Sequence, residues 1–264
     1  MNAYLLLEDG TRYGCTILNA EVCSDITVIG ELVFNNVVVG FQELLTDPSC
    51  VGQAVCLTYP LVGNCGANSS DYTGERVYPT AVVAREICDT PSNFKMEERF
   101  GSFLARHGTI VITGVDTRAL TRHLRDNGTM KAAVVRGEGH EEKASTLIKQ
   151  YKNGDLIAES TVKEKREYKA GNARYNVSAL DLGICKDIIK ALNDRGCNVA
   201  LYPCSSGVEE LFEPGTGGIL IAGGSDSGDS NEIYTEKIKE IMKKDIPVLG
   251  ISSGHLFIDR KSVV

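Results

Sequence analysis

The second half of the chain alternates apolar segments with amphipathic ones, and this pattern constrains the fold more than any other feature. Apolar segments typical of buried strands occupy residues 177–180, 198–201, 218–222 and 247–251. Segments with helical spacing lie between them at residues 184–195, 208–212 and 232–244. Strands that alternate with helices in this way favour a parallel sheet with right-handed crossovers. We therefore expect a ligand site at the carboxyl ends of these strands.

The first part of the chain, up to about residue 137, has a different texture and predicts a mixed α/β unit. Residues 4–7 and 11–15 flank Asp9 and Gly10, a pair that favours a tight hairpin turn. Further segments are predicted as strands at 31–34, 54–57 and 109–112, and as a helix at 97–107.

A second helix is predicted over residues 116–128, with Asp116 as its N-cap and Gly128 as the residue that ends it. Leu120 and Leu124 share its inner face. Arg118, Arg122 and Arg125 fall mainly on its outer face, which is either a solvated surface or a surface for an acidic partner.

Residues 138–171 carry seven acidic and seven basic side chains but few large apolar ones. Residues 141–151 fit a solvated helix, and 161–167 fit an exposed connector. We therefore predict an N-terminal domain over 1–150, a charged linker over 151–174 and a second domain over 175–264.

Composition excludes several classes of function. The 264 residues have a net charge of −7, so we expect no binding to nucleic acid. No apolar run approaches the roughly 20 residues that span a bilayer, and the start lacks a basic signal region, so we expect a cytoplasmic protein with no membrane contact. Nine widely spaced cysteines without a CxxC pair predict buried free thiols, with no metal or cofactor.

The motif Gly250-Ile251-Ser252-Ser253-Gly254 follows the last predicted strand and has the G-x-S-x-G pattern of a nucleophile elbow. A Gly-rich turn at residues 222–226 ends a neighbouring strand and could supply the other half of an anion pocket. A plain Gly/Ser turn is the alternative interpretation. A serine nucleophile needs a histidine base and an acid, and only His255 and Asp259 follow the elbow. We expect His107, His123 and His140 to have surface or packing roles.

The chain resembles the small subunit of carbamoyl-phosphate synthetase from about residue 5 to residue 257. The resemblance is carried by residues 7–11, 30–35, 40–49, 59–64, 114–122, 181–186 and 195–197. It implies an N-terminal domain that docks on a large synthetase subunit, followed by a class I glutamine amidotransferase domain. The implied activity is hydrolysis of glutamine to supply ammonia for carbamoyl phosphate, used in pyrimidine and arginine synthesis.

The sequence departs from the family pattern at the elbow. Ser252 replaces the nucleophilic cysteine, Ser253 a usual leucine, and Leu256 a glutamine-contacting Gln. Gly224 keeps its glycine in the family's glycine-rich loop, while Asp226 replaces the second. The downstream His and Glu would lie beyond Val264, so we expect a C-terminally short, partial domain, from a natural truncation or a fragment. Ser49 matches a family serine that contacts glutamine.

Three functions stay open from the sequence. In the first, the chain is a glutaminase-dead or ammonia-type small subunit, a scaffold or regulatory partner of a large subunit that binds glutamine weakly. In this hypothesis Ser252 sits inactive at the nucleophile position, and Ser49, Gly224, Asp226, Ser253 and Leu256 line the substrate site. The second is a serine hydrolase that uses Ser252, and the third a free-standing module that binds an amino acid.

Overall fold

The hairpin predicted at the start of the chain is present. It joins β1 (Ala3–Leu7) to β2 (Arg12–Ile17) in an antiparallel pair. Gly10 has a φ of +90°, and Asp9 Oδ1 accepts the N–H of Thr11 at 2.9 Å, so both residues form the tight turn that the sequence predicted.

The structure is a computed structural model that describes residues 3–224 and 231–262.

Contacts divide the chain into two units, Met1–Asn153 (unit 1) and Gly154–Val264 (unit 2). Unit 1 is built on a closed barrel whose strands follow the order β1-β2-β8-β6-β4-β3-β9. The remaining barrel strands are β3 (Ile26–Asn35), β4 (Gln53–Leu57), β6 (Ala81–Val83), β8 (Ile110–Thr113) and β9 (Met130–Arg136). Its pairs are antiparallel except β3–β4, β4–β6 and β6–β8, which are parallel. The mixed α/β class expected for this part is confirmed.

The side chains of β1 show how the barrel is filled. Successive residues of a strand point to opposite faces. Leu5 and Leu7 are buried in the larger hydrophobic cluster, whereas Leu6 is buried in a second cluster with residues of α4 (Glu141–Gln150). This strand is therefore apolar on both faces.

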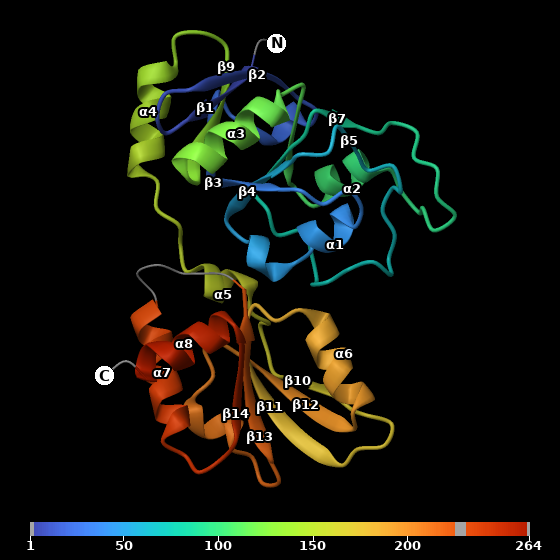
Figure 1. Ribbon diagram of the computed structural model, residues 1–264, viewed down its shortest axis with the longest axis vertical. Helices are drawn as coiled ribbons and strands as arrows, with labels where there is room; N and C mark the ends of the chain where they lie inside the picture. Colours follow the sequence, from blue (N-terminus) through green and yellow to red (C-terminus); the bar gives the residue numbers. More distant parts are fainter. Residues whose placement is uncertain (1–2, 225–230, 263–264) are drawn as a thin grey trace. The chain divides into compact units, whose positions relative to one another are not determined.

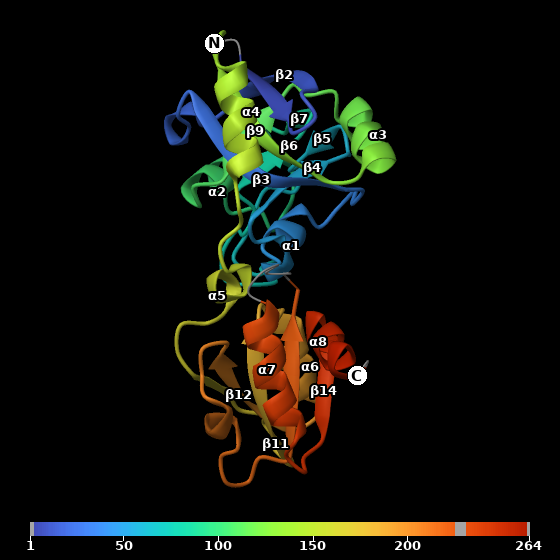
Figure 2. The ribbon, with the colours of Figure 1, turned by 90° about the vertical axis from the view of Figure 1, so that its left-hand side faces the viewer.

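Helices and short elements cover the barrel of unit 1 (Figure 2). They are η1 (Ala20–Val22), α1 (Phe41–Leu45), η2 (Pro48–Cys50), β5 (Leu61–Val62), β7 (Glu86–Ile87), α2 (Phe100–Arg106), α3 (Thr117–Asn127) and α4. Asp116 Oδ1 caps α3 by accepting the N–H of Ala119, and Leu120 and Leu124 are buried as predicted. In contrast, α4 is not fully solvated, because Ala144 and Ile148, one turn apart, are completely buried against the barrel.

Unit 2 is a five-stranded sheet in the order β10-β12-β11-β13-β14. Its strands are β10 (Arg166–Tyr168), β11 (Tyr175–Leu182), β12 (Cys197–Pro203), β13 (Gly218–Gly223) and β14 (Val248–Ser252). The last four pair in parallel, which confirms the predicted sheet. Residues 166–168 fall in the predicted charged linker of residues 151–174, but they pair antiparallel with β12 at the edge of the sheet.

Helices cover both faces of this sheet, as Figure 1 shows. They are α5 (Leu156–Ser160), α6 (Lys186–Asp194), η3 (Val208–Leu211), α7 (Asn231–Met242) and α8 (Ser253–Ser262). Along β13, Ile219 and Ile221 pack in a cluster with residues of α7 and α8, whereas Leu220 and Ala222 pack in the cluster that includes Ile189 of α6. Within the described residues, no helix combines the length and the apolar character that a membrane span requires.

Candidate functional site

The predicted elbow has the geometry of a sharp strand-to-helix turn. β14 ends at Ser252 and α8 begins at the next residue. Ser252 has a φ of +55°, and it is the only residue other than glycine with a positive φ in the described part of the chain. A left-handed conformation costs an L-residue roughly 1–2 kcal/mol. The surrounding packing therefore holds Ser252 in a strained backbone conformation, as a nucleophile elbow requires.

The two glycines of the motif allow this turn because the backbones around it approach closely. A Cβ atom at Gly254 would collide with the backbone carbonyl of Ile221 in β13. A Cβ atom at Gly250 would lie 2.7 Å from Ile258 Cδ1 and 2.9 Å from the carbonyl oxygen of Gly254. The spacing of glycines around Ser252 thus follows from the packing of α8 directly on the sheet.

The Ser252 side chain is exposed and has no activating partner in the described structure. Among residues 3–224 and 231–262, no imidazole or carboxylate is hydrogen-bonded to its hydroxyl. His255, the only histidine in the sequence of unit 2, lies exposed on α8 itself. A serine hydroxyl is a poor nucleophile without a hydrogen-bonded base. The described residues therefore form an elbow without a base.

The other residues predicted for the substrate site fall in different places. Gly223 pairs in register with Ser252, so Gly224 directly follows the strand beside the elbow. Ser253 starts α8; its side chain is buried, and its hydroxyl has no hydrogen-bond partner in the described structure. Leu256 lies on α8 and is 56% exposed. Asp226 lies outside the described residues.

Ser49 belongs to unit 1, whereas the elbow residues belong to unit 2. It is half-buried in η2, and its N–H donates to Asp47 Oδ1 at 2.8 Å. Asp47 thereby caps the short helix, the turn-setting role that its place before Pro48 favours.

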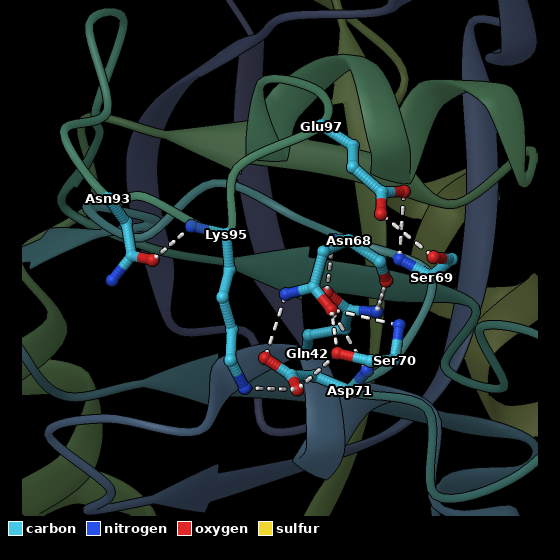
Figure 3. Close-up of polar contacts among 8 residues, drawn as sticks. All are labelled: Gln42, Asn68, Ser69, Ser70, Asp71, Asn93, Lys95 and Glu97. Atoms are coloured by element: carbon cyan, nitrogen blue, oxygen red, sulfur yellow. Dashed lines mark hydrogen bonds and ion pairs between the residues drawn. The ribbon is translucent and has the colours of Figure 1, made fainter.

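The segment of residues 40–49, which contains Ser49, also contributes Gln42 to a polar network in unit 1 (Figure 3). The Gln42 side chain is 4% exposed; its Nε2 donates to the carbonyl of Asn68 at 2.6 Å, and its Oε1 accepts the N–H of Asn68 at 2.9 Å. Asp71 accepts from Asn68 Nδ2 at 2.7 Å and pairs with Lys95 at 3.3 Å. The hydrogen bond from Asn68 is the main cause that lowers the pKa of Asp71. This network holds the loop around residue 68 against α1.

Sequence reasoning missed the role of Asp181 at the carboxyl end of β11. Its carboxylate is 2% exposed and accepts three backbone N–H groups: those of Gly183 at 2.9 Å, Ile184 at 2.7 Å and Val162 at 2.7 Å. Burial raises the pKa of Asp181, and the three donors oppose that rise. The residue ties the segment after α5 to the edge of the sheet where the elbow lies. A turn-forming Asp two residues before Gly183 was the only available signal.

A second buried cluster follows β12. Tyr234 donates its hydroxyl hydrogen to Asp155 Oδ2 at 2.7 Å, and the same hydroxyl lies 3.5 Å from Cys204 Sγ. Lys237 Nζ donates to the carbonyls of Cys204 and Ser206, and burial lowers the pKa of this ammonium group. These contacts join residues far apart in sequence, so no local pattern could predict them.

The cysteines form no disulfide: all nine are free. Four are buried as expected (Cys23, Cys50, Cys56 and Cys204), but four are only half-buried (Cys15, Cys88, Cys185 and Cys197) and Cys65 is exposed. Burial raises the pKa of both Cys50 and Cys56 to about 12. Among the described residues, no three His, Cys, Asp or Glu side chains are grouped in a way that could hold a metal ion.

Comparison with known proteins defines the class. Residues 5–134 match the family model "Carbamoyl-phosphate synthase small chain, CPSase domain", and residues 178–261 match the model "Glutamine amidotransferase class-I". The first match falls within unit 1, which holds the barrel, and the second within unit 2, which holds the parallel sheet.

Individual relatives give the same assignment. The carbamoyl phosphate synthase small chain of Yersinia pseudotuberculosis is 34% identical over 96% of this chain and 69% of its own length. That of Clostridium perfringens is 36% identical over 97% and 71%, and that of Staphylococcus haemolyticus is 37% identical over 96% and 67%. The chain belongs to the carbamoyl-phosphate synthase small chain family.

Proposed function

We propose that this chain is a small subunit that does not hydrolyse glutamine and that acts as a scaffold or regulatory partner of a synthetase large subunit. The observation that carries the proposal is the lack of a base beside Ser252. This residue occupies the elbow, yet no imidazole or carboxylate among the described residues is hydrogen-bonded to it.

The chemistry of the elbow residue supports this proposal. A cysteine at a helix N-terminus supplies thiolate near neutral pH, because its pKa starts near 8.5 and is lowered there. A serine hydroxyl supplies no comparable nucleophile without a base. The loss of one member of a catalytic triad typically costs about 10⁴–10⁶ in rate.

A large-subunit partner is supported by family membership and by apolar side chains left in solvent on unit 1. Phe94 is 94% exposed and Val39 is 70% exposed, and both line a hollow of about 580 Å³. Large apolar groups gathered at one surface mark sites of association in soluble proteins. We expect glutamine binding at Gly224, Ser253 and Leu256 to be weak, because the Leu256 side chain offers no polar group to an amide.

The decisive experiment measures ammonia release from glutamine by the full chain, alone and with the large subunit of the same organism. We expect no release above background from the wild type, from Ser252→Ala or from Ser252→Cys, because even a thiol at this elbow has no described base. Turnover by the wild type that disappears in Ser252→Ala would contradict the proposal.

The strained geometry of Ser252 favours a second candidate function, a serine hydrolase. A fluorophosphonate probe separates the two. We expect no labelling of the wild type above the level of Ser252→Ala, and stoichiometric labelling of Ser252 would favour the hydrolase.

A further inference from the structure

A cavity of about 630 Å³ in unit 1 collects positive charge beside α3. Its lining includes Arg118, Arg122 and Arg125 from α3, and Arg85 from the segment between β6 and β7. None of the described residues that line it is acidic. We call these four residues the arginine surface. The chain as a whole has a net charge of −7, so this concentration does not follow from composition.

Most of this charge is not compensated within the described part of the protein. Arg125 lies 3.0 Å from Asp126, but both side chains are more than half exposed (65% and 61%), and exposed pairs contribute little. Arg85, Arg118 and Arg122 have no ion pair among the described residues. The backbone carbonyl of Arg85 accepts the N–H of Gly114 at 2.9 Å, which holds this residue beside the segment that leads into α3.

The stability of α3 does not explain the arginines. Arg118 and Arg122 are four residues apart on one helix face, where like charges repel. Arg118 is the second residue of the helix, where the macrodipole disfavours a cation. Both residues would be better placed as neutral or acidic side chains if the helix alone mattered. Their arrangement therefore indicates negative charge supplied from outside unit 1.

The exposure of the four side chains indicates what kind of ligand supplies that charge. A small-molecule site typically buries more than two thirds of its ligand. All four arginines are exposed, and α3 lies on the outer side of the barrel (Figure 2). The acidic net charge of the chain opposes a nucleic acid. An acidic protein surface remains, and arginine is enriched in protein interfaces because its planar group binds carboxylates through two parallel hydrogen bonds.

We propose that the arginine surface of α3 docks a carboxylate-rich segment of the synthetase large subunit. The inference rests on the large-subunit partnership proposed above and assigns it a place on unit 1. The exposed guanidinium groups attract the acidic segment during encounter and pair with its carboxylates in the complex.

The test compares binding of the full chain to the large subunit of the same organism by surface plasmon resonance, at low and at high salt. The variant Arg118→Glu/Arg122→Glu reverses two charges of the surface. Lys143→Glu/Lys149→Glu is the matched control, since it makes the same change in net charge at two exposed positions of α4. Arg118→Gln/Arg122→Gln removes the charge alone and guards against a folding defect from reversal.

We expect the arginine reversal to weaken binding about tenfold or more at low salt and to flatten the salt dependence, because like charges would face the partner. The glutamine pair should fall in between, and the lysine control should stay within about twofold of the wild type. Binding of all variants equal to that of the wild type would overturn the arginine surface but leave the partnership standing.

Two further outcomes complete the test. No binding by the wild type itself would overturn both the partnership and this surface. The last arm titrates the wild type with pyrophosphate alone. Saturable pyrophosphate binding that the arginine reversal abolishes, with large-subunit binding unchanged, would assign the cavity to a small anion and overturn the proposal.

Discussion

At the scale of single residues, the strain at Ser252 is measurable. Its φ of +55° is a conformation that glycine adopts freely and other residues do not. We expect Ser252→Gly to raise the free energy of unfolding of unit 2 by about 0.5–1 kcal/mol, because the relieved strain exceeds the entropic cost of glycine. Ser252→Ala keeps the Cβ atom and the strain, so it should change stability by less than about 0.5 kcal/mol.

Urea unfolding followed by circular dichroism compares the three proteins. If Ser252→Gly proved no more stable than Ser252→Ala, the backbone at the elbow would not be strained in solution.

The close approach at Gly254 makes the opposite prediction. A methyl group there would collide with the Ile221 carbonyl, and a backbone atom in a sheet cannot move aside. We expect Gly254→Ala to lower the free energy of unfolding of unit 2 by about 3 kcal/mol, the upper end of the range for overpacked sites. Gly171→Ala in the same unit is the control, because a Cβ atom at Gly171 meets nothing within 4 Å.

Equal midpoints of urea unfolding for the two alanine variants would contradict this packing. A loss confined to Gly254→Ala would show that α8 is locked on the sheet by contact between backbones.

At the scale of elements, the Gln42 side chain links α1 to the loop around Asn68 through both of its amide atoms (Figure 3). Gln42→Ala would leave the N–H and the carbonyl of Asn68 unpaired. An unsatisfied buried group costs about 1–3 kcal/mol, so we expect a loss of about 2–4 kcal/mol in unit 1. Hydrogen exchange at the Asn68 amide should accelerate in parallel.

Asn93→Ala provides the control for this network. Asn93 is exposed, and within the described part of the chain its side chain accepts only the N–H of Lys95, at 2.9 Å, so the loss should stay within about 0.5 kcal/mol. Unchanged protection of the Asn68 amide in Gln42→Ala would mean that the loop is held by other contacts.

Elements with local signals were predictable from the sequence. The hairpin at Gly10 and the limits of α3 at Asp116 and Gly128 depend on turn and cap residues whose preferences are intrinsic. The edge strand β10 was missed because its three residues are partly charged and pair with a strand about thirty positions later. Edge strands tolerate such charges, so the sequence pattern resembled that of a connector.

Contacts between residues far apart in sequence also limited how much of the candidate site could be predicted. The elbow was predictable because its glycines and Ser252 are neighbours in sequence. Closure of the barrel was not, since β2 pairs with β8 and β3 with β9, far apart along the chain. The three donors to Asp181 come from two segments, and only one of these segments is adjacent to it.

At the scale of the whole molecule, nine free thiols in very different surroundings should be distinguishable by reaction rate. The thiolate is the reactive form, so burial and a raised pKa both slow modification. Burial raises the pKa of Cys15 to about 11 and that of Cys50 and Cys56 to about 12, whereas Cys65 is exposed. We expect a fast phase of one thiol per chain with Ellman's reagent at pH 8, and nine thiols in urea.

Cys65→Ser should remove the fast phase and leave eight thiols in urea, whereas Cys56→Ser should leave the fast phase intact. Rapid reaction of several thiols in the native protein would show that the buried cysteines of the two units open to solvent more often than their packing allows. A fast phase that persists in Cys65→Ser would mean that the rapidly reacting thiol is one of the half-buried ones, Cys88, Cys185 or Cys197. The outcome therefore measures how well each unit shields its core.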